Sequence, residues 1–229
     1  MYSFENINYQ YKSNKKVLHD ISFSIPENCF NVLIGDNGCG KTTLLKVVYG
    51  ILKCDSYSVQ GGIECSDMAL VGDAEEVNWC DGMRGSDDNV KLLLPLHKNF
   101  SYSKYEKLIT AMGWSQEDRR KRYLTLSTGQ MMQFQLAFNL AKNPKLLLMD
   151  EPLANLDPMI KHDLIKIIQE EISDRDLTVL MSTHLIDEVS EVTDYLVRME
   201  KGTVKAEGYT EDLEKQYGVS SIWDLLSKC

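Results

Sequence analysis

Short apolar runs alternate along this chain with segments whose apolar positions recur at helical spacing. Residues 21–25 (ISFSI) switch strictly between apolar and polar side chains, which predicts a strand. Residues 29–34 (CFNVLI) form a compact apolar run that ends at a glycine, which predicts a buried strand. Apolar positions then follow the period of a helix over residues 41–52. The pattern therefore predicts a strand, a glycine-rich loop and a helix in direct succession.

The same alternation returns in the last third of the chain. Residues 146–150 (LLLMD) and 178–183 (TVLMST) predict buried strands. The amphipathic segment 157–172 between them predicts a helix with a proline in its first turn. The other predicted elements are strands at 2–11, 59–65 and 68–72, helices at 89–97, 103–114 and 185–192, a hairpin at 195–208, and short helices at 210–217 and 221–227.

Strands that alternate with helices favour a parallel sheet covered on both faces, so the predicted fold class is α/β. Only helices are predicted in the stretch of about 78–125, which interrupts the alternation. We therefore expect one domain spanning residues 1–229, with about 78–125 forming a small helical subdomain inserted in its core.

Composition narrows the possible partners and compartment. The net charge of −9 gives an acidic surface, which disfavours a nucleic-acid partner. The longest apolar runs fall well short of the ~20 residues that span a bilayer. The N-terminus lacks an apolar signal core, and the six cysteines have no metal-binding spacing. We expect a cytoplasmic protein with reduced thiols that reaches a membrane only through a partner.

The loop GDNGCGKTT matches the pattern G-x-x-x-x-G-K-[ST] through Gly35, Gly40, Lys41 and Thr42. Glycines let successive backbone N–H groups turn inward around a polyphosphate, and the following helix points its positive end at the phosphates. Lysine adds a charge at the outer phosphates, and the threonine hydroxyl suits Mg²⁺. The residues predicted to bind the nucleotide's phosphates here are Gly35, Asp36, Asn37, Gly38, Cys39, Gly40, Lys41, Thr42 and Thr43.

Two adjacent carboxylates follow the buried strand 146–150. Asp150 ends that strand and Glu151 comes next. Neighbouring carboxylates repel one another and are costly to desolvate, which an ordinary acidic turn does not require. We predict that Asp150 and Thr42 hold Mg²⁺, and that Glu151 orients or deprotonates the water that attacks the γ-phosphate.

A capped helix and a strand-end histidine complete the pattern. Ser127 stands as the N-cap of an amphipathic helix in the segment 124–144, and His184 ends the strand 178–183. In order, the chain carries GDNGCGKTT, LSTGQ, LLLMDEP, NLDP and STH. This ordered set resembles the nucleotide-binding domain of ATP-binding cassette (ABC) proteins. The match runs from about residue 2 to 208, through the Walker A, signature, Walker B, D-loop and switch-histidine motifs.

The resemblance implies a P-loop ATPase core with a mostly parallel sheet, an N-terminal antiparallel β subdomain and an inserted helical subdomain. It also implies that two such domains sandwich two ATP molecules head to tail. His184 would then contact the γ-phosphate, Asp157 would bridge the dimer, and Tyr11, with Tyr9 as the alternative, would stack on adenine. The signature residues expected to reach the partner's ATP are Ser127, Thr128, Gly129 and Gln130.

Two positions depart from the family pattern. Thr128 replaces the first glycine of the usual L-S-G-G-Q, which either adds a hydrogen bond to phosphate or slows closure. No glutamine follows the predicted strand 68–72, where the family's Q-loop begins. Asp73 is the predicted Mg²⁺ ligand there, with Glu75 as an alternative, or the loop is simply remodelled.

The resemblance implies the ATPase subunit of an ABC transporter, using ATP and Mg²⁺. Its expected partners are a second nucleotide-binding domain and separate integral membrane permease subunits, which would hold it on the cytoplasmic face of the membrane. The predicted helical subdomain resembles those of short export-type ATPases, so export is the predicted direction. A regulatory or mechanical ABC ATPase is the alternative. A DNA-repair ABC protein is disfavoured because no sustained heptads separate Walker A from the signature.

Overall fold

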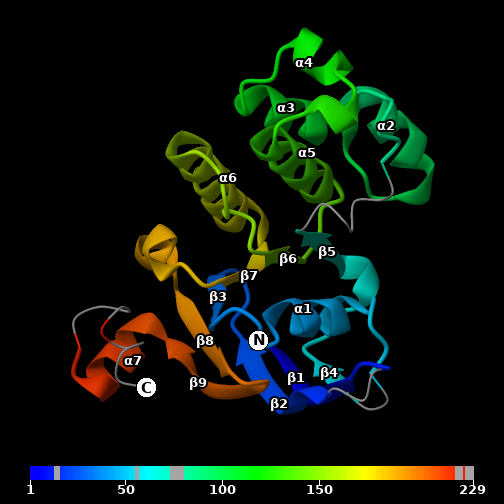
Figure 1. Cartoon of the computed structure of the whole chain (residues 1–229). Helices are drawn as coiled ribbons and strands as arrows, with labels where there is room; N and C mark the ends of the chain where they lie inside the picture. Colours follow the sequence, from blue (N-terminus) through cyan, green and yellow to red (C-terminus); the bar gives the residue numbers. More distant parts are fainter. Residues whose placement is uncertain (13–15, 55–56, 73–79, 220–223, 225–229) are drawn as a thin grey trace.

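The computed structural model describes residues 1–12, 16–54, 57–72, 80–219 and 224. These residues form two β-sheets, with some helices packed on the larger sheet and others gathered at one end of the molecule (Figure 1).

The larger sheet has six strands in the order β5-β6-β7-β3-β8-β9. Neighbouring strands run parallel except β8 and β9, which form an antiparallel hairpin. Such an arrangement confirms the predicted α/β class with a mostly parallel sheet. The strands are β5 (Met68–Val71), β6 (Leu146–Asp150), β7 (Thr178–Thr183), β3 (Phe30–Ile34), β8 (Tyr195–Glu200) and β9 (Thr203–Tyr209).

The smaller sheet is antiparallel and comes mostly from the N-terminal part of the chain, as expected. Its order is β2 (Lys16–Ile25), β1 (Tyr2–Gln10) and β4 (Ser58–Gln60). The strand predicted at 59–65 was wrong beyond Gln60. Gly61 and Gly62 take positive φ values of 103° and 70° there, which turn the chain out of the strand.

Both faces of the larger sheet are buried, as its near-continuous apolar strands require. In β3, Val32 and Ile34 face one apolar core, which the helices α5 and α6 complete. Leu33 faces the second core, between the sheet, α1 and the smaller sheet. These two cores hold the strands rigidly, so the loops that leave their carboxyl ends are well positioned.

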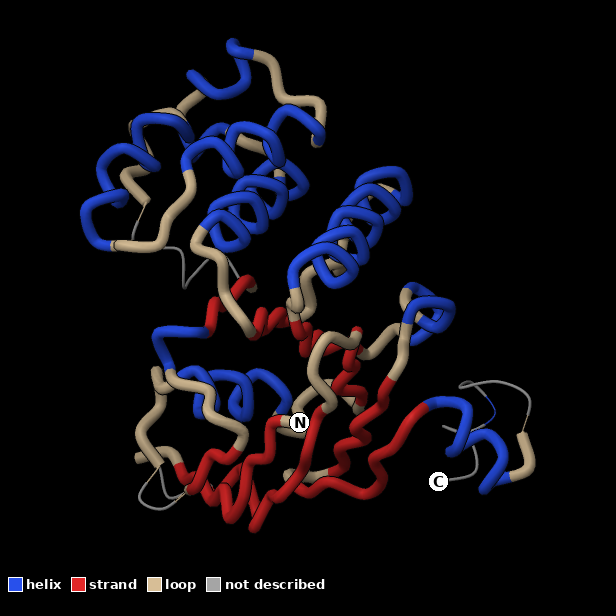
Figure 2. The backbone as a smooth tube through the Cα atoms, turned by 180° about the vertical axis from the view of Figure 1, so that it is seen from behind, coloured by secondary structure: helices blue, strands red, loops and turns tan. Residues whose placement is uncertain are grey.

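The helices divide between the sheet and one end of the molecule. The α-helices are α1 (Lys41–Tyr49), α2 (Ser86–Leu93), α3 (Tyr102–Ala111), α4 (Gln116–Arg120), α5 (Thr128–Ala141), α6 (Pro158–Arg175) and α7 (Thr210–Tyr217). In Figures 1 and 2, α2 to α5 gather at the end farthest from the smaller sheet. Single 3₁₀ turns are η1 (Cys65–Asp67), η3 (Leu94–Leu96), η4 (Tyr123–Thr125), η5 (Ile186–Glu188) and η6 (Ser190–Val192).

The helix predicted at 185–192 was wrong. Two 3₁₀ turns occupy this segment, because Val189 between them has φ −132° and ψ 0° and breaks the helical path. Ile186 and Val189 are buried, so the apolar pattern reflects packing rather than an α-helix. Most of the helix predicted at 221–227 lies outside the described residues. In the part of the chain that the structure describes, no helix is long and apolar enough to cross a bilayer.

Candidate functional site

The phosphate loop, the carboxylate pair and His184 meet at the carboxyl ends of three neighbouring parallel strands. Ile34 of β3 is in register with Thr183 of β7, and Asp150 of β6 is in register with Ser182 of β7. The loops that follow these strands therefore start side by side (Figure 1). Ligands of open α/β sheets bind at this edge.

The glycine-rich loop leaves the N-terminus of α1 open to an anion. Gly40, the N-cap, has φ 114°, and no side chain caps the helix. Its first-turn N–H groups are therefore available to phosphate, which the helix dipole also favours. A side chain at Gly35 would lie 2.4 Å from the carbonyl oxygen of Met199 on β8, so only glycine fits at that position.

Lys41 is nearly buried at the first position of α1, and it contacts the second carboxylate of the predicted pair. Its Nζ donates to the Gly35 carbonyl at 2.6 Å and lies 3.2 Å from Glu151 Oε1. The side chain is 5% exposed. A buried ammonium needs such partners, and a bound phosphate would replace the carboxylate in this role.

Glu151 bridges Lys41 and His184. Its second oxygen, Oε2, lies 2.8 Å from His184 Nδ1 and accepts a longer bond of 3.3 Å from the His184 backbone N–H. Because a carboxylate only accepts, Nδ1 carries the proton in this contact. The backbone of Glu151 has φ 45°, a left-handed conformation that is uncommon for a non-glycine residue and often found at functional sites.

Asp150 is oriented by a serine on the neighbouring strand. The Ser182 hydroxyl donates to Asp150 Oδ1 at 2.6 Å and accepts from the Glu151 backbone N–H at 3.1 Å. The Ser182 carbonyl accepts from that same N–H at 3.1 Å. One residue of β7 thus contacts both members of the carboxylate pair.

A pocket of about 300 Å³ lies over the loop and α1. Tyr11 forms one wall, and its hydroxyl lies 3.2 Å from Thr43 Oγ1. Tyr9, the alternative, packs edge-on against the Tyr11 ring, with centroids 5.0 Å apart. The lining residues are Tyr11, Val17, Asn37, Gly38, Gly40, Lys41, Thr42, Thr43 and Glu151.

The signature residues stand apart from this pocket, at the start of α5. Ser127 Oγ accepts from the Gln130 backbone N–H at 3.2 Å, and Gln130 Oε1 accepts from the Ser127 N–H at 3.1 Å. This capping box leaves the Ser127 hydroxyl proton free for another acceptor. Thr128 is exposed in the first turn, where a helical backbone does not require glycine. Gly129 is buried beneath Ile160 of α6.

Asp157 is exposed at the N-cap position of α6, and its side chain makes no capping bond. Asp73 and Glu75 lie outside the described residues, so their predicted role stays a prediction. The last described residue before them, Gly72, donates its N–H to Gln135 Oε1 at 3.3 Å.

A comparison of the sequence with protein-family profiles establishes the family of the chain. Residues 18–154, more than half of the chain, match the profile of the ABC transporter family. The chain belongs to this family. Members are ATPases coupled to transport, so the predicted enzyme class and ATP as ligand are confirmed, whereas Mg²⁺ remains a prediction.

The sequence of this ABC ATPase is similar to those of several transporter ATP-binding proteins. The energy-coupling factor transporter ATP-binding protein EcfA2 of Lactococcus lactis is 29% identical over 93% of this chain and 80% of its own length. The uncharacterized ABC transporter ATP-binding protein YdbJ of Bacillus subtilis is 31% identical over 85% and 65%. The phosphonates import ATP-binding protein PhnC 1 of Haloquadratum walsbyi is 27% identical over 92% and 73%.

Solved structures share the fold of this ABC ATPase. An ATP-binding subunit of an ABC transporter superposes with a TM-score of 0.84 and 22% identity, covering 100% of this chain and 98% of that one. A bacterial Atm1-family ABC exporter with ATP bound gives a TM-score of 0.79 and 16% identity, covering 99% and 41%. At these identities the likeness establishes the fold alone.

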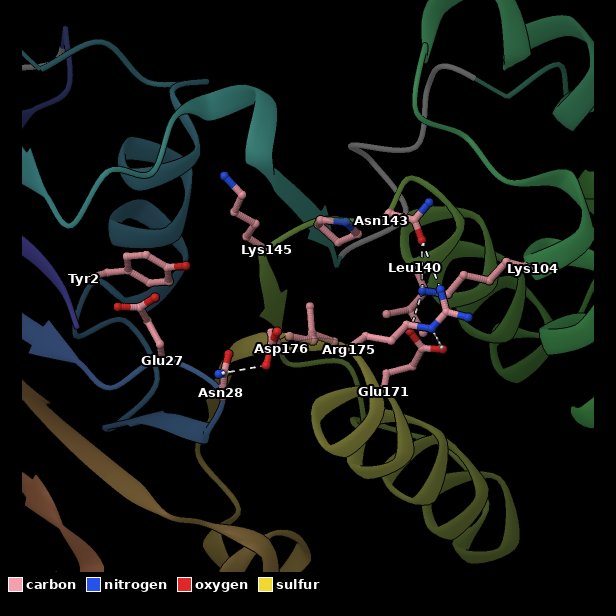
Figure 3. A pocket seen from close by; sticks show the side chains of 12 residues that line it. Tyr2, Glu27, Asn28, Lys104, Leu140, Asn143, Lys145, Glu171, Arg175 and Asp176 are labelled. Carbon is pink, nitrogen blue, oxygen red and sulfur yellow. Dashed lines mark hydrogen bonds and ion pairs between the residues drawn. The ribbon is translucent and has the colours of Figure 1, made fainter.

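A larger pocket of about 580 Å³ lies at the opposite, amino edge of the sheet of this ABC ATPase (Figure 3). Its most buried charge is Lys104 of α3, which pairs with Glu171 of α6. Arg175 and Lys104 both donate to Asn143, and Lys145 pairs with Asp67 at 3.2 Å. These cations contact protein oxygens and form a network of ion pairs and hydrogen bonds that lines the pocket and joins α3 to α6.

Sequence reasoning missed two residues of the site in this ABC ATPase. Val17 lines the pocket beside Tyr11, at the start of β2. Ser182 donates to the Asp150 carboxylate and accepts from the Glu151 backbone N–H, as described above. The signal for Ser182 was present in MSTH, because a polar residue that directly follows three apolar strand positions, two positions before His184, needs a buried partner.

Cys39 is less accessible than its place in the phosphate loop suggests. The side chain is 7% exposed, and burial raises the pKa of its thiol. We therefore expect iodoacetamide at pH 7.5 to modify the exposed Cys65 well before Cys39, because alkylation needs both a thiolate and access of the reagent to the sulfur. Peptide mass spectrometry of a time course measures this order. Modification of Cys39 as fast as Cys65 would contradict the loop geometry.

Proposed function

We propose that this chain is the ATP-hydrolysing subunit of a transporter whose membrane domains are separate chains. The observation that supports it most directly is the placement of Lys41 and Glu151 in one pocket, 3.2 Å apart, over the uncapped N-terminus of α1. This is the arrangement that phosphoryl transfer to water needs, with a cation for the phosphate and a base for the water.

The oxygen donors of the site fit Mg²⁺. Thr42 presents an exposed hydroxyl in the first turn of α1, and Asp150 presents a carboxylate of which Ser182 occupies only Oδ1. Hard oxygen ligands of this kind suit the ion, which usually keeps several waters in addition. Thr42 and Asp150 would hold it, with Asp73 as the further predicted ligand. When bound, Mg²⁺ would neutralise charge on the phosphate oxygens.

The protein residues would act in a defined order. ATP binding replaces the Lys41–Glu151 contact with a contact between Lys41 and phosphate. Glu151 is then free to orient the attacking water and accept its proton. His184, whose Nδ1 donates to Glu151, would contact the γ-phosphate through an Nε2–H group, which requires both ring nitrogens to carry a proton. Tyr11 supplies the aromatic surface at the adenine end of the pocket.

The site would be completed by a second nucleotide-binding domain. The signature residues do not line the pocket of their own chain, and Ser127 and Thr128 are exposed. The N-terminus of α5 would offer hydroxyl and backbone donors to the partner's γ-phosphate, in the manner of an anion at a helix N-terminus. Asp157, without a capping bond, would contact the partner across the same interface.

Permease subunits are the proposed membrane partners, and they would hold the chain at the cytoplasmic face. An exposed apolar groove of about 250 Å³ between α1 and α5 would receive them. Leu96 is 73% exposed there and Ile51 is 49% exposed. Exposed apolar side chains gathered at one groove are typical of a surface that a partner protein covers.

Capture of the tagged full-length chain from native membranes tests this partner. We expect an integral membrane protein to co-purify, and Leu96→Asp to weaken its recovery several-fold. The matched control is Tyr209→Asp, because Tyr209 is an exposed aromatic residue on the edge strand β9. This variant should leave the recovery of the membrane protein unchanged. If neither the parent protein nor the control variant recovers a membrane protein, the result favours the regulatory or mechanical alternative.

Export is the proposed direction, from the resemblance of the helical segment to short export-type ATPases. The names of the relatives do not favour it, since one is a phosphonates import protein and another belongs to an energy-coupling factor transporter. Identification of the captured membrane partner would decide between export and import.

A further inference from the structure

We propose that Ser182 is a positioning residue whose single hydroxyl aligns the two carboxylates of the site, Asp150 for the metal and Glu151 for water. This inference rests on the proposed function of those carboxylates. It assigns a role to the first residue of the STH motif, in which the sequence predicted a role only for His184.

The geometry places Ser182 between both groups. It lies directly opposite Asp150 in the parallel register of β6 and β7. Its hydroxyl bonds Asp150 Oδ1 at 2.6 Å and the Glu151 N–H at 3.1 Å. Ser182 itself is 0% exposed, so no bulk water competes for these bonds.

The chemistry of the three groups fixes the direction of each bond. A carboxylate accepts and a backbone N–H donates, so the one hydroxyl proton must point at Asp150 and a lone pair must point at Glu151. The bond to Oδ1 restricts rotation of the Asp150 carboxylate, which orients Oδ2. The bond to the N–H supports the left-handed backbone of Glu151, at φ 45°.

A purely structural role explains less of this arrangement. The Ser182 carbonyl already accepts from the Glu151 N–H at 3.1 Å, so the hydroxyl is not needed to satisfy that donor. The three residues before it on β7, Val179, Leu180 and Met181, are apolar and fully buried. Burying a hydroxyl costs free energy unless it forms hydrogen bonds. The group that accepts the proton of this hydroxyl is Asp150, the predicted metal ligand.

The test compares Ser182→Ala with Ser86→Ala, a matched buried serine on α2 that bonds a backbone carbonyl away from the site. Mn²⁺ affinity of the ATP complex is measured by electron paramagnetic resonance in the Glu151→Gln background, which separates metal binding from turnover. ATP affinity in EDTA and thermal unfolding are measured on the same proteins.

We expect Ser182→Ala to weaken Mn²⁺ binding by about 10- to 100-fold, the effect typical of removing the hydrogen-bond partner of a metal ligand. ATP affinity in EDTA should stay within about 2-fold, and Ser86→Ala should not weaken Mn²⁺ binding. Ser182→Thr, which keeps the hydroxyl, should restore most of the loss.

Unchanged Mn²⁺ affinity in Ser182→Ala would overturn the inference. If that variant does not fold, Ser182→Cys replaces it, because the thiol fills similar space but donates weakly; equal affinity in Cys and parent proteins would then overturn the inference. Failure of the proposed function is distinguishable, since the parent protein would then bind neither ATP nor Mn²⁺.

Discussion

Glu151→Gln is expected to lower the ATPase rate by about 10²- to 10⁴-fold, the range for removal of a general base, while ATP still binds. Glutamine keeps the shape of the side chain but cannot accept the proton of the attacking water. It also loses the charge that pairs with Lys41 at 3.2 Å and with His184 at 2.8 Å. Lys41 would therefore be released to phosphate, so ATP affinity should hold or rise.

Phosphate release in a single turnover measures the hydrolysis step, and gel filtration with and without Mg-ATP measures dimer formation. Glu151→Gln should form an ATP-dependent dimer that persists, because the nucleotide is not split. Glu188→Gln is a matched control, since Glu188 pairs with Lys161 away from the pocket and should leave turnover unchanged. Lys41→Ala should lose ATP binding. Hydrolysis by Glu151→Gln at the parent rate would show that another group activates water.

The fold class and the phosphate loop were predictable because each rests on local physics. Buried parallel strands must be apolar along their length, as LLLMD and TVLMST are. A loop that wraps phosphate needs glycine at fixed places, and Gly40 indeed adopts φ 114°. Ser127 was predicted as an N-cap from its place before an amphipathic helix, and the capping box with Gln130 confirms it.

The errors arose where packing between distant segments decides local conformation. The segment 185–192 carries apolar residues at helical spacing, yet its backbone breaks at Val189 because Ile186 and Val189 are both buried against the sheet. Strand β4 ends at Gln60 because two glycines follow it. Neither effect is visible in a short window of sequence.

The arrangement inside the site depended on register, which sequence alone does not reveal. Ser182 and Asp150 are far apart in the chain and meet only because β6 and β7 pair in parallel. The bridge from Lys41 through Glu151 to His184 likewise needs three strand ends at one edge of the sheet. The motifs indicated which residues take part, whereas the contacts among them required the structure.

Lys104→Ala is expected to lower the free energy of unfolding by about 3–5 kcal/mol, the cost of breaking a buried ion pair and leaving the Glu171 carboxylate with only its 3.8 Å contact to the half-exposed Arg175. Lys104 is 6% exposed and Glu171 is 12% exposed, so little water reaches the carboxylate that would remain. Burial lowers the pKa of Lys104, which agrees with a poorly hydrated ammonium. The pair joins α3 to α6, so its loss would also loosen the helical end from the sheet (Figure 3).

Urea unfolding followed by circular dichroism measures this change, with Lys166→Ala as the matched control. Lys166 pairs with Glu170 on the exposed face of α6 at 4.0 Å, so its loss should cost no more than about 0.5 kcal/mol. The double variant Lys104→Met/Glu171→Leu removes both charges and should recover most of the stability, because the penalty comes from the unpaired charge rather than from the lost attraction. Equal losses in Lys104→Ala and in the double variant would instead mean that the ion pair itself, with its bonds to Asn143 and Arg175, stabilises the junction.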